Sequence, residues 1–94
     1  MIFTRGAATI ISGIETRPTD PLIPAFATVL RRRREALDLS QEALARRAGI
    51  STVFVGRVES TRNQPTINSM QKLATGLDAR LSDLIREAEA LAKR

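Results

Sequence analysis

Apolar side chains recur at helical spacing in five stretches of this 94-residue chain, and polar, turn-forming residues separate the stretches. The last stretch shows the pattern well, because Leu84, Ala88 and Leu91 follow one another at intervals of four and three residues. Such intervals place side chains on one face of a helix. No strand is predicted in the body of the chain. The pattern therefore predicts an all-α fold, a compact five-helix bundle.

The first helix is expected to begin near Pro24, because the residue before a proline avoids the helical region and proline suits a first turn. The pair Asp20-Pro21 is a competing start. Along this helix Phe26, Leu30 and Leu37 recur at intervals of four and seven residues, which indicates an amphipathic helix.

The stretch from Gln41 to Ser60 has the layout of a helix-turn-helix. Ser40 is a suitable N-cap for its first helix, and Gly49 can adopt the left-handed conformation that ends that helix. Ser51 can then cap a second helix over Thr52 to Glu59. In one interpretation this second helix enters the major groove of DNA. In the other it belongs to any tight αα-hairpin of an all-helical domain, and spacing alone does not decide between them.

One charged residue interrupts the apolar face of the first helix, since Arg34 lies four residues after Leu30 and three before Leu37. A charge in such a position requires a partner. Glu59 lies four residues after Val55 and shares its inward face. We therefore predict a partly buried Arg34–Glu59 ion pair that fixes the orientation of the two helices rather than adding net stability.

The remaining helices follow a polar loop. Thr66 is a plausible N-cap for the fourth helix, in which Met70 is expected to fill a gap in the core. The last helix, about residues 81–93, is more apolar than a short core-capping helix needs. Leu84, Ala88 and Leu91 are therefore predicted to form a homodimer seam; the alternative is a contact within one chain or a frayed end. In a dimer, two recognition helices roughly 34 Å apart would reach successive major grooves.

Residues 1–21 show no helical period and contain two glycines and two prolines. We expect an N-terminal arm that is either flexible or held by contacts of Ile10, Ile11 and Ile14 with the domain or with a partner chain. The helix-turn-helix domain is then residues 22–94.

The composition excludes several classes of site. The chain has no cysteine and no histidine, so disulfides, thiolate metal sites and the commonest general base are absent. No cofactor, no metal site and no enzymatic activity are expected. There is also no apolar run of about 18 residues and no signal-peptide pattern, so we expect a cytoplasmic protein without a membrane partner.

The positive charge lies where the helix-turn-helix lies. Residues 22–72 carry nine basic and four acidic residues, which gives the whole net charge of +5, whereas residues 1–21 and 73–94 are balanced at two against two and four against four. Binding to nucleic acid requires such an excess of basic residues, because they neutralise phosphates. The alternative interpretation is a charged face that only contacts solvent. Of the four consecutive arginines, which fan over about 300° of a helix, Arg31 and Arg32 are the expected phosphate contacts; Arg33 is ambiguous.

Four fragments, in order from about Leu30 to Ile85, carry a resemblance to a known family: LRRRREALDLSQEALARRAGI, TVFVGRVES, PTINSMQKLA and LSDLI. Together they resemble the phage repressor and Cro-like helix-turn-helix regulators, often called the XRE family. The resemblance implies a lambda-repressor-like fold. It also implies that Gln41 touches a DNA phosphate and braces the recognition helix, and that Thr52, Val53 and Arg57 reach base edges.

Further roles follow from the same resemblance. Arg57 is expected to bond O6 and N7 of a guanine, and Val53 to meet a thymine methyl group; Ser51 lies at a helix N-terminus that favours phosphate. Phe54 can be core or a backbone contact. The candidate DNA-binding residues are Arg31, Arg32, Gln41, Ser51, Thr52, Val53, Arg57, Arg62 and Asn63.

The chain departs from the family at helix ends. Asp38, Thr61 and Asp78 stand where relatives commonly have glycine; aspartate tolerates the left-handed conformation but β-branched threonine does not. The end of the recognition helix is therefore expected to differ from that of the family. Arg80 replaces a typical Ser or Thr cap, which puts the start of the last helix in doubt by a residue or two.

The leading functional hypothesis is a sequence-specific, double-stranded-DNA-binding transcriptional regulator that acts as a dimer on a palindromic operator. Its size and the TRN segment after the recognition helix resemble the restriction-modification controller proteins. The alternative is an antitoxin-type protein-interaction module that masks a partner protein; a toxin or RNA polymerase are possible protein partners.

Overall fold

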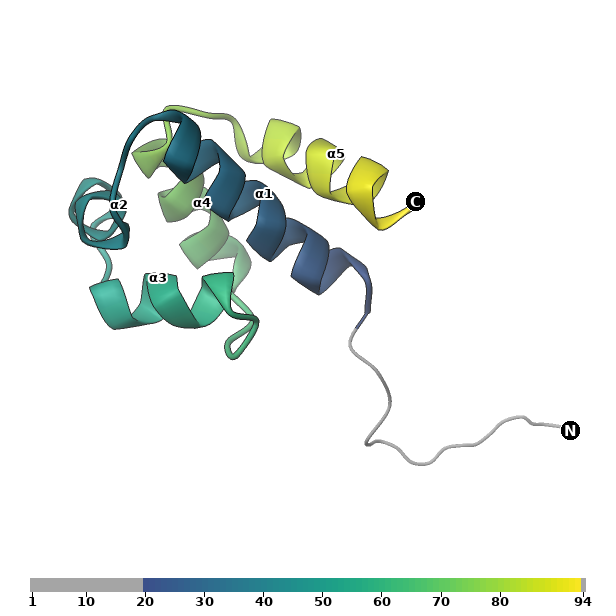
Figure 1. Ribbon diagram of the computed structural model, residues 1–94, viewed down its shortest axis with the longest axis horizontal. Helices are drawn as coiled ribbons and strands as arrows, with labels where there is room; N and C mark the ends of the chain where they lie inside the picture. Colours follow the sequence, from purple (N-terminus) through teal and green to yellow (C-terminus); the bar gives the residue numbers. More distant parts are fainter. Residues whose placement is uncertain (1–19, 94) are drawn as a thin grey trace, which may run out of the picture.

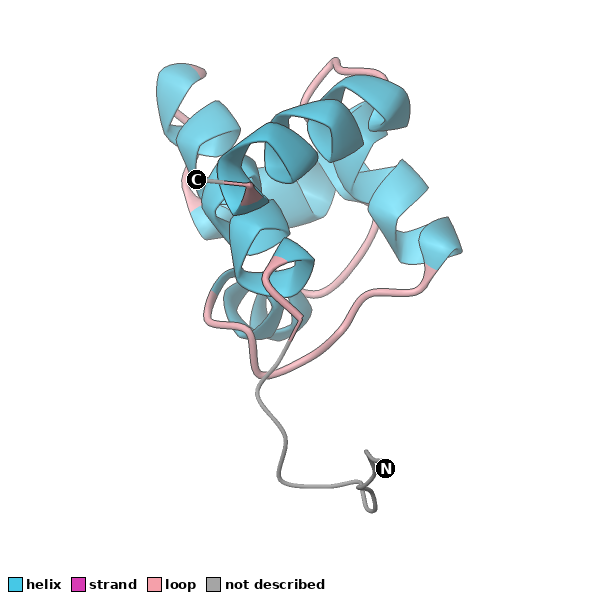
Figure 2. Ribbon diagram, turned by 90° about the vertical axis from the view of Figure 1, so that its right-hand side faces the viewer, coloured by secondary structure: helices cyan, strands magenta, loops and turns pink. Residues whose placement is uncertain are grey.

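The computed structural model describes residues 20–93 of the chain. They form five helices, α1 (Leu22–Ala36), α2 (Gln41–Ala48), α3 (Thr52–Glu59), α4 (Ile67–Gly76) and α5 (Leu81–Ala92) (Figure 1). Within these residues Figure 2 shows helices and loops only, which confirms the predicted all-α fold of five helices. None of the described helices is long and apolar enough to cross a membrane. The expectations for the N-terminal arm fall on residues 1–19, outside the described part.

Helix α1 begins at Leu22, two residues before the predicted start at Pro24, which was therefore wrong. The competing start is the observed one, because Pro21 is the N-cap and the carboxylate of Asp20 accepts the N–H of Leu22 at 2.9 Å. Pro24 is tolerated inside the first turn since an N–H there would have no partner within the helix.

Three predicted N-caps are present. The side-chain oxygens of Ser40, Ser51 and Thr66 accept the N–H three residues further on, at 2.9, 3.1 and 3.1 Å. Gly49 ends α2 in the left-handed conformation, at φ 72°. The local signals of the helix-turn-helix therefore act as the sequence predicted.

Every helix contributes to one core. Helix α1 packs on α5 and α3, and α2 packs on α3 and α4 (Figure 1). The largest fully buried side chains come one from each helix, and they are Leu30, Leu44, Val55, Leu73 and Leu84. Met70 is partly buried against this cluster, as expected of a gap-filling side chain. This packing holds α2 and α3 at a fixed angle on the surface of the domain.

The last residue of α4, Gly76, lies where α2 crosses α4 closely. A Cβ at Gly76 would lie 2.9 Å from Cδ1 of Leu44 and 3.2 Å from the backbone nitrogen of Ala48. We expect Gly76→Ala to lower the free energy of unfolding by about 1 to 3 kcal/mol through overpacking, measured by urea denaturation.

Gly56 provides the matched control for that substitution. A Cβ there would meet only the side chain of Gln41, at 3.4 Å, and alanine is preferred over glycine inside a helix by roughly 0.5 to 1 kcal/mol. Gly56→Ala should therefore be neutral or stabilising. A Gly76→Ala protein as stable as the parent would contradict the close packing of α2 on α4.

Helices α1, α3 and α4 are each followed closely by a left-handed residue that is not glycine: Asp38 (φ 57°), Thr61 (φ 62°) and Asp78 (φ 54°). Thr61 takes the left-handed conformation despite its branched Cβ, contrary to the expectation for threonine. That the end of the recognition helix differs from that of the family stays a prediction. Helix α5 begins at Leu81 with Arg80 as its N-cap, and the Arg80 side chain makes no capping bond.

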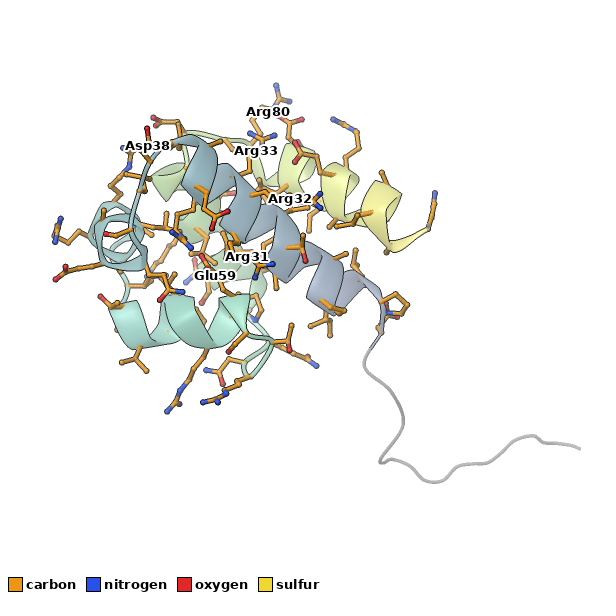
Figure 3. All side chains as sticks on the ribbon, in the orientation of Figure 1. Arg31, Arg32, Arg33, Asp38, Glu59 and Arg80 are labelled. Atoms are coloured by element: carbon orange, nitrogen blue, oxygen red, sulfur yellow. The ribbon has the colours of Figure 1, made fainter. Side chains whose placement is uncertain are left out.

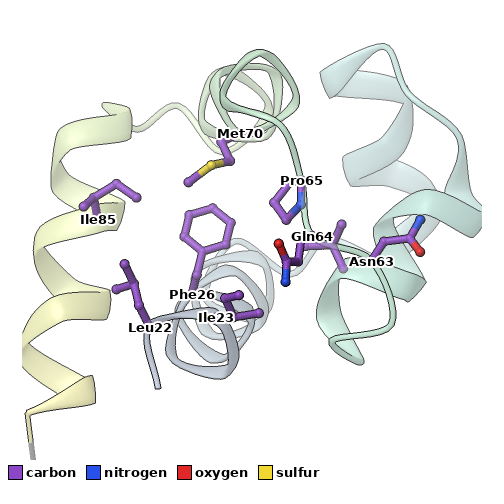
Figure 4. A pocket seen from close by; sticks show the side chains of 9 residues that line it. Leu22, Ile23, Phe26, Asn63, Gln64, Pro65, Met70 and Ile85 are labelled. Carbon is purple, nitrogen blue, oxygen red and sulfur yellow. The ribbon is translucent and has the colours of Figure 1, made fainter. Parts of the chain in front are cut away.

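A small apolar hollow of about 120 Å³ lies beneath the loop that connects α3 and α4 (Figure 4). Leu22 and Phe26 of α1, Met70 of α4 and Ile85 of α5 line it. Pro65, in the loop, contributes a further wall and is half-buried. The loop between α3 and α4 is therefore packed on the domain through Pro65.

Candidate nucleic-acid interface

Helix α3 has one buried and one exposed face. Val55 and Val58 are 0% and 2% exposed, so they anchor the helix in the core. Val53, which is 63% exposed, and Arg57 lie four residues apart and share the side of α3 opposite the core, its free face. Thr52 is exposed in the first turn, beside that face. The three residues predicted to read bases are therefore all accessible on one short helix.

The predicted ion pair joins α1 to the end of this helix. Nε of Arg34 donates to Oε2 of Glu59 at 2.7 Å, and Nη2 donates to Oε1 at 3.1 Å. The two side chains are only 12% and 4% exposed. The remaining nitrogen, Nη1, donates to the carbonyl oxygen of Leu39 at 2.7 Å. Hydrogen bonding to Glu59 raises the pKa of the Arg34 guanidinium above its ordinary value, so the arginine stays charged.

Gln41 adds the third member of this network. Its Nε2 donates to Oε1 of Glu59 at 3.0 Å, and its side chain lies against Gly56 in the middle of α3. The bracing role implied for Gln41 is therefore present, and α1, α2 and α3 all meet at one carboxylate. Its contact with a phosphate remains a prediction. The sequence pattern did not single out Gly56 as the residue that Gln41 lies against.

The four consecutive arginines of α1 point to different neighbours. Arg31 lies on the side of α1 toward α3, above the position of Glu59, whereas Arg32 lies on the side toward α5 (Figure 3). Arg32 lines a shallow hollow between α1 and the end of α5, together with Leu91. The structure therefore does not bring Arg32 to the recognition helix, because successive helical residues diverge by about 100°.

Arg33, which the sequence left ambiguous, is an intramolecular contact. It forms an ion pair with Glu87 of α5, and its Nε donates to Oε1 of that residue at 3.3 Å. This hydrogen bonding raises the pKa of the Arg33 guanidinium. Arg33 therefore ties α1 to α5 on the side of the domain away from α3.

Further ion pairs narrow the set of free cations. Arg47 donates to the carbonyl oxygen of Gly76 at 2.7 Å and to the carboxylate of Asp78 at 2.9 Å, and so closes α2 on α4. Within residues 20–93, Arg31, Arg57 and Arg62 are among the cations with no carboxylate oxygen within 4.0 Å. Fewer arginines are therefore available near α3 than the sequence contains. Arg31, Arg57 and Arg62 are available because no described carboxylate pairs with them.

The loop after α3 is fixed to that helix through one carbonyl group. The carbonyl oxygen of Arg57 accepts the N–H groups of Arg62 at 2.8 Å and Asn63 at 3.2 Å, and the hydroxyl of Ser60 at 3.3 Å. Arg62 is exposed and Asn63 is half-buried. The candidate contacts in the loop therefore keep a constant position relative to Arg57.

The predicted dimer seam needs correction. Leu84 and Ala88 are both 0% exposed, because α5 uses that face to cover α1 within the same chain. Of the three predicted seam residues only Leu91 retains accessible surface. The sequence could not distinguish these cases, since an apolar stripe looks the same whether its partner is internal or a second copy.

Comparison with known proteins agrees with this geometry. The family model for HTH_3, a helix-turn-helix, matches residues 30–84. The HTH-type transcriptional regulator SutR of Escherichia coli K12 is 32% identical over 60 residues, which are 64% of this chain and 34% of SutR. The chain thus spans about a third of the length of that curated relative.

Two solved structures share the fold. The restriction-modification controller protein C.AhdI of Aeromonas hydrophila is 38% identical, with a TM-score of 0.63 over 67% of this chain and 94% of C.AhdI. The clp gene regulator ClgR of Corynebacterium glutamicum is 21% identical, with a TM-score of 0.74 over 80% and 81% of the two chains, and shows the shared fold alone. The resemblance predicted from the sequence is confirmed: the chain belongs to the HTH_3 helix-turn-helix family.

Proposed function

We propose that this protein is a sequence-specific DNA-binding transcriptional regulator that inserts α3 into the major groove. The observation that carries the proposal is the free face of α3, where Thr52, Val53 and Arg57 project from a helix held by the buried Arg34–Glu59 pair. The fixed orientation of α3 is important because base reading depends on the position of each side chain relative to the base edges. Membership of the HTH_3 family supports the same function.

The contacts divide into base reading and backbone positioning. Arg57 reads a guanine through its planar fork, and Val53 packs on a thymine methyl group. Ser51 and the first turn of α3 face phosphate, as helix N-termini favour. Arg31 and Arg62 neutralise phosphates on either side, since both are exposed and have no carboxylate partner among residues 20–93. Gln41 adds a phosphate contact with the amide hydrogen that does not bind Glu59.

A narrower proposal concerns the type of regulator and its assembly. The likeness to C.AhdI, which extends over 94% of that protein, supports a controller-type regulator. We propose a homodimer whose contact lies around Leu91, where α1 and the end of α5 leave a shallow hollow that Pro24 and Ala92 line together with the polar Thr28 and Arg32. A monomer mass at tens of micromolar, unchanged with concentration in sedimentation equilibrium, would overturn the dimer.

The test uses the purified full chain and a library of duplexes with a randomised centre. Selection should yield one palindromic sequence, and binding to it should weaken steeply with salt, because each neutralised phosphate adds about 0.9 to the slope of log affinity against log salt concentration. DNA from upstream of the protein's own gene provides a natural duplex for the same measurement. Equal binding to all duplexes, or binding that needs a second protein, would contradict the proposal.

A further inference from the structure

Thr61 holds a backbone conformation that its side chain disfavours. Its φ is 62°, and branching at Cβ makes this left-handed region unfavourable for threonine. Two other described residues, Asp38 and Asp78, share the conformation, but aspartate tolerates it better. Glycine would remove the strain at position 61, so the threonine needs a reason outside backbone geometry.

Contacts within the domain do not supply that reason. Thr61 is exposed, so no burial of its methyl group repays the strain. Among the described residues its hydroxyl donates only to the adjacent carbonyl oxygen of Ser60, at 2.5 Å. The N–H of Thr61 donates to the carbonyl oxygen of Val58 at 3.1 Å, a bond that glycine would make equally well. The Thr61 side chain is thus free for a contact with another molecule.

The position of Thr61, close to α3, favours DNA as that molecule. It follows α3 by two residues, in the loop that the Arg57 carbonyl group holds at both Arg62 and Asn63. Arg62, its neighbour, is exposed and without a carboxylate partner in the described part of the chain. A strained, exposed residue on a fixed loop next to a binding helix fits a ligand contact, since strain persists at sites where function uses it.

We propose that the hydroxyl of Thr61 donates a hydrogen bond to a DNA phosphate at the edge of the groove that α3 enters. The inference rests on the proposed function and adds a residue to it. On binding, rotation of the hydroxyl exchanges the Ser60 carbonyl oxygen for a phosphate oxygen, which is a stronger acceptor because it is charged. Such a contact adds affinity without reading sequence.

Thr61→Val tests the hydroxyl, because it keeps the branched shape and the strain. We expect affinity for the selected duplex to fall roughly 5- to 10-fold, with the preferred sequence and the salt slope unchanged, since no charge is lost. Thr61→Ser keeps the hydroxyl and should bind like the parent. Thr61→Gly should raise the melting temperature and still bind more weakly, whereas Asp38→Gly, which relieves strain elsewhere, should not weaken binding.

Two outcomes overturn the inference while leaving the proposed function intact. Thr61→Val could bind as tightly as a parent that itself selects one sequence; the hydroxyl then has no role in binding. Thr61→Ser could lose as much affinity as Thr61→Val; the methyl group and the loop shape would then be responsible. If the parent selects no sequence at all, the proposed function fails and the inference fails with it.

Discussion

Glu59→Ala is expected to lower the free energy of unfolding by about 3 to 5 kcal/mol, because it leaves the nearly buried guanidinium of Arg34 without its counter-charge. Arg34 is 12% exposed and donates two hydrogen bonds to this carboxylate. The substitution also removes the acceptor of the Gln41 amide. A domain of this size has a total stability of only about 5 to 15 kcal/mol, so urea denaturation should show a large shift in midpoint.

Two further variants separate charge from position. Glu59→Gln keeps the shape and one acceptor oxygen, so its loss should be smaller than that of Glu59→Ala. Arg86→Ala removes one partner of an ion pair whose side chains are 75% and 40% exposed, and such surface pairs contribute little. A Glu59→Ala protein as stable as the parent would show that the Arg34–Glu59 pair does not hold α3 in place.

The Arg57→Ala protein should lose about 1 to 3 kcal/mol of binding free energy for the selected duplex, which is roughly a 5- to 150-fold rise in Kd. Arg57 is exposed on the free face of α3 and has no carboxylate partner among residues 20–93. Its loss should relax the preference at one base position in each half-site. Repeating the selection with the variant measures this directly.

Two matched arginine variants control for charge. Arg31→Ala should weaken all duplexes alike and reduce the salt slope by about one contact, because Arg31 reaches phosphate rather than bases. Arg80→Ala removes the same charge at the start of α5 and should change neither sequence preference nor specific affinity appreciably. Arg57→Ala with an unaltered preferred sequence would exclude base reading by this residue.

The Arg34–Glu59 pair was predictable because each half follows from a local pattern. Arg34 stands out as a charge within an apolar stripe, and Glu59 shares a helical face with Val55. A buried charge requires an opposite charge, and few candidates exist in a chain of 94 residues. The caps at Ser40, Ser51 and Thr66 were predictable for a similar reason, since they satisfy N–H groups only three residues away.

The structure differs from the predictions at positions where the local sequence pattern is compatible with more than one packing partner or conformation. The apolar stripe of α5 fits both an internal contact and a dimer seam, and burial of Leu84 and Ala88 shows that the internal contact uses it. The start of α1 depended on which of two prolines lies outside the helix. Threonine disfavours the left-handed conformation, but the N–H groups of Arg62 and Asn63 both bond to the carbonyl oxygen of Arg57. These hydrogen bonds outweigh the preference of Thr61, so the turn forms.

The sequence by itself determined that there are five helices, the three N-caps at Ser40, Ser51 and Thr66 and the exposed side of α3, because helical period and capping depend on residues within about one turn of each other. The family followed from the order and spacing of four fragments that resemble known regulators. Only the tertiary structure decided that Arg32 and Arg33 face α5, that Arg31 faces α3, and that Gln41 joins the buried pair. These facts depend on the angles at which helices cross. Packing between residues far apart in the chain sets those angles, and no local pattern records them.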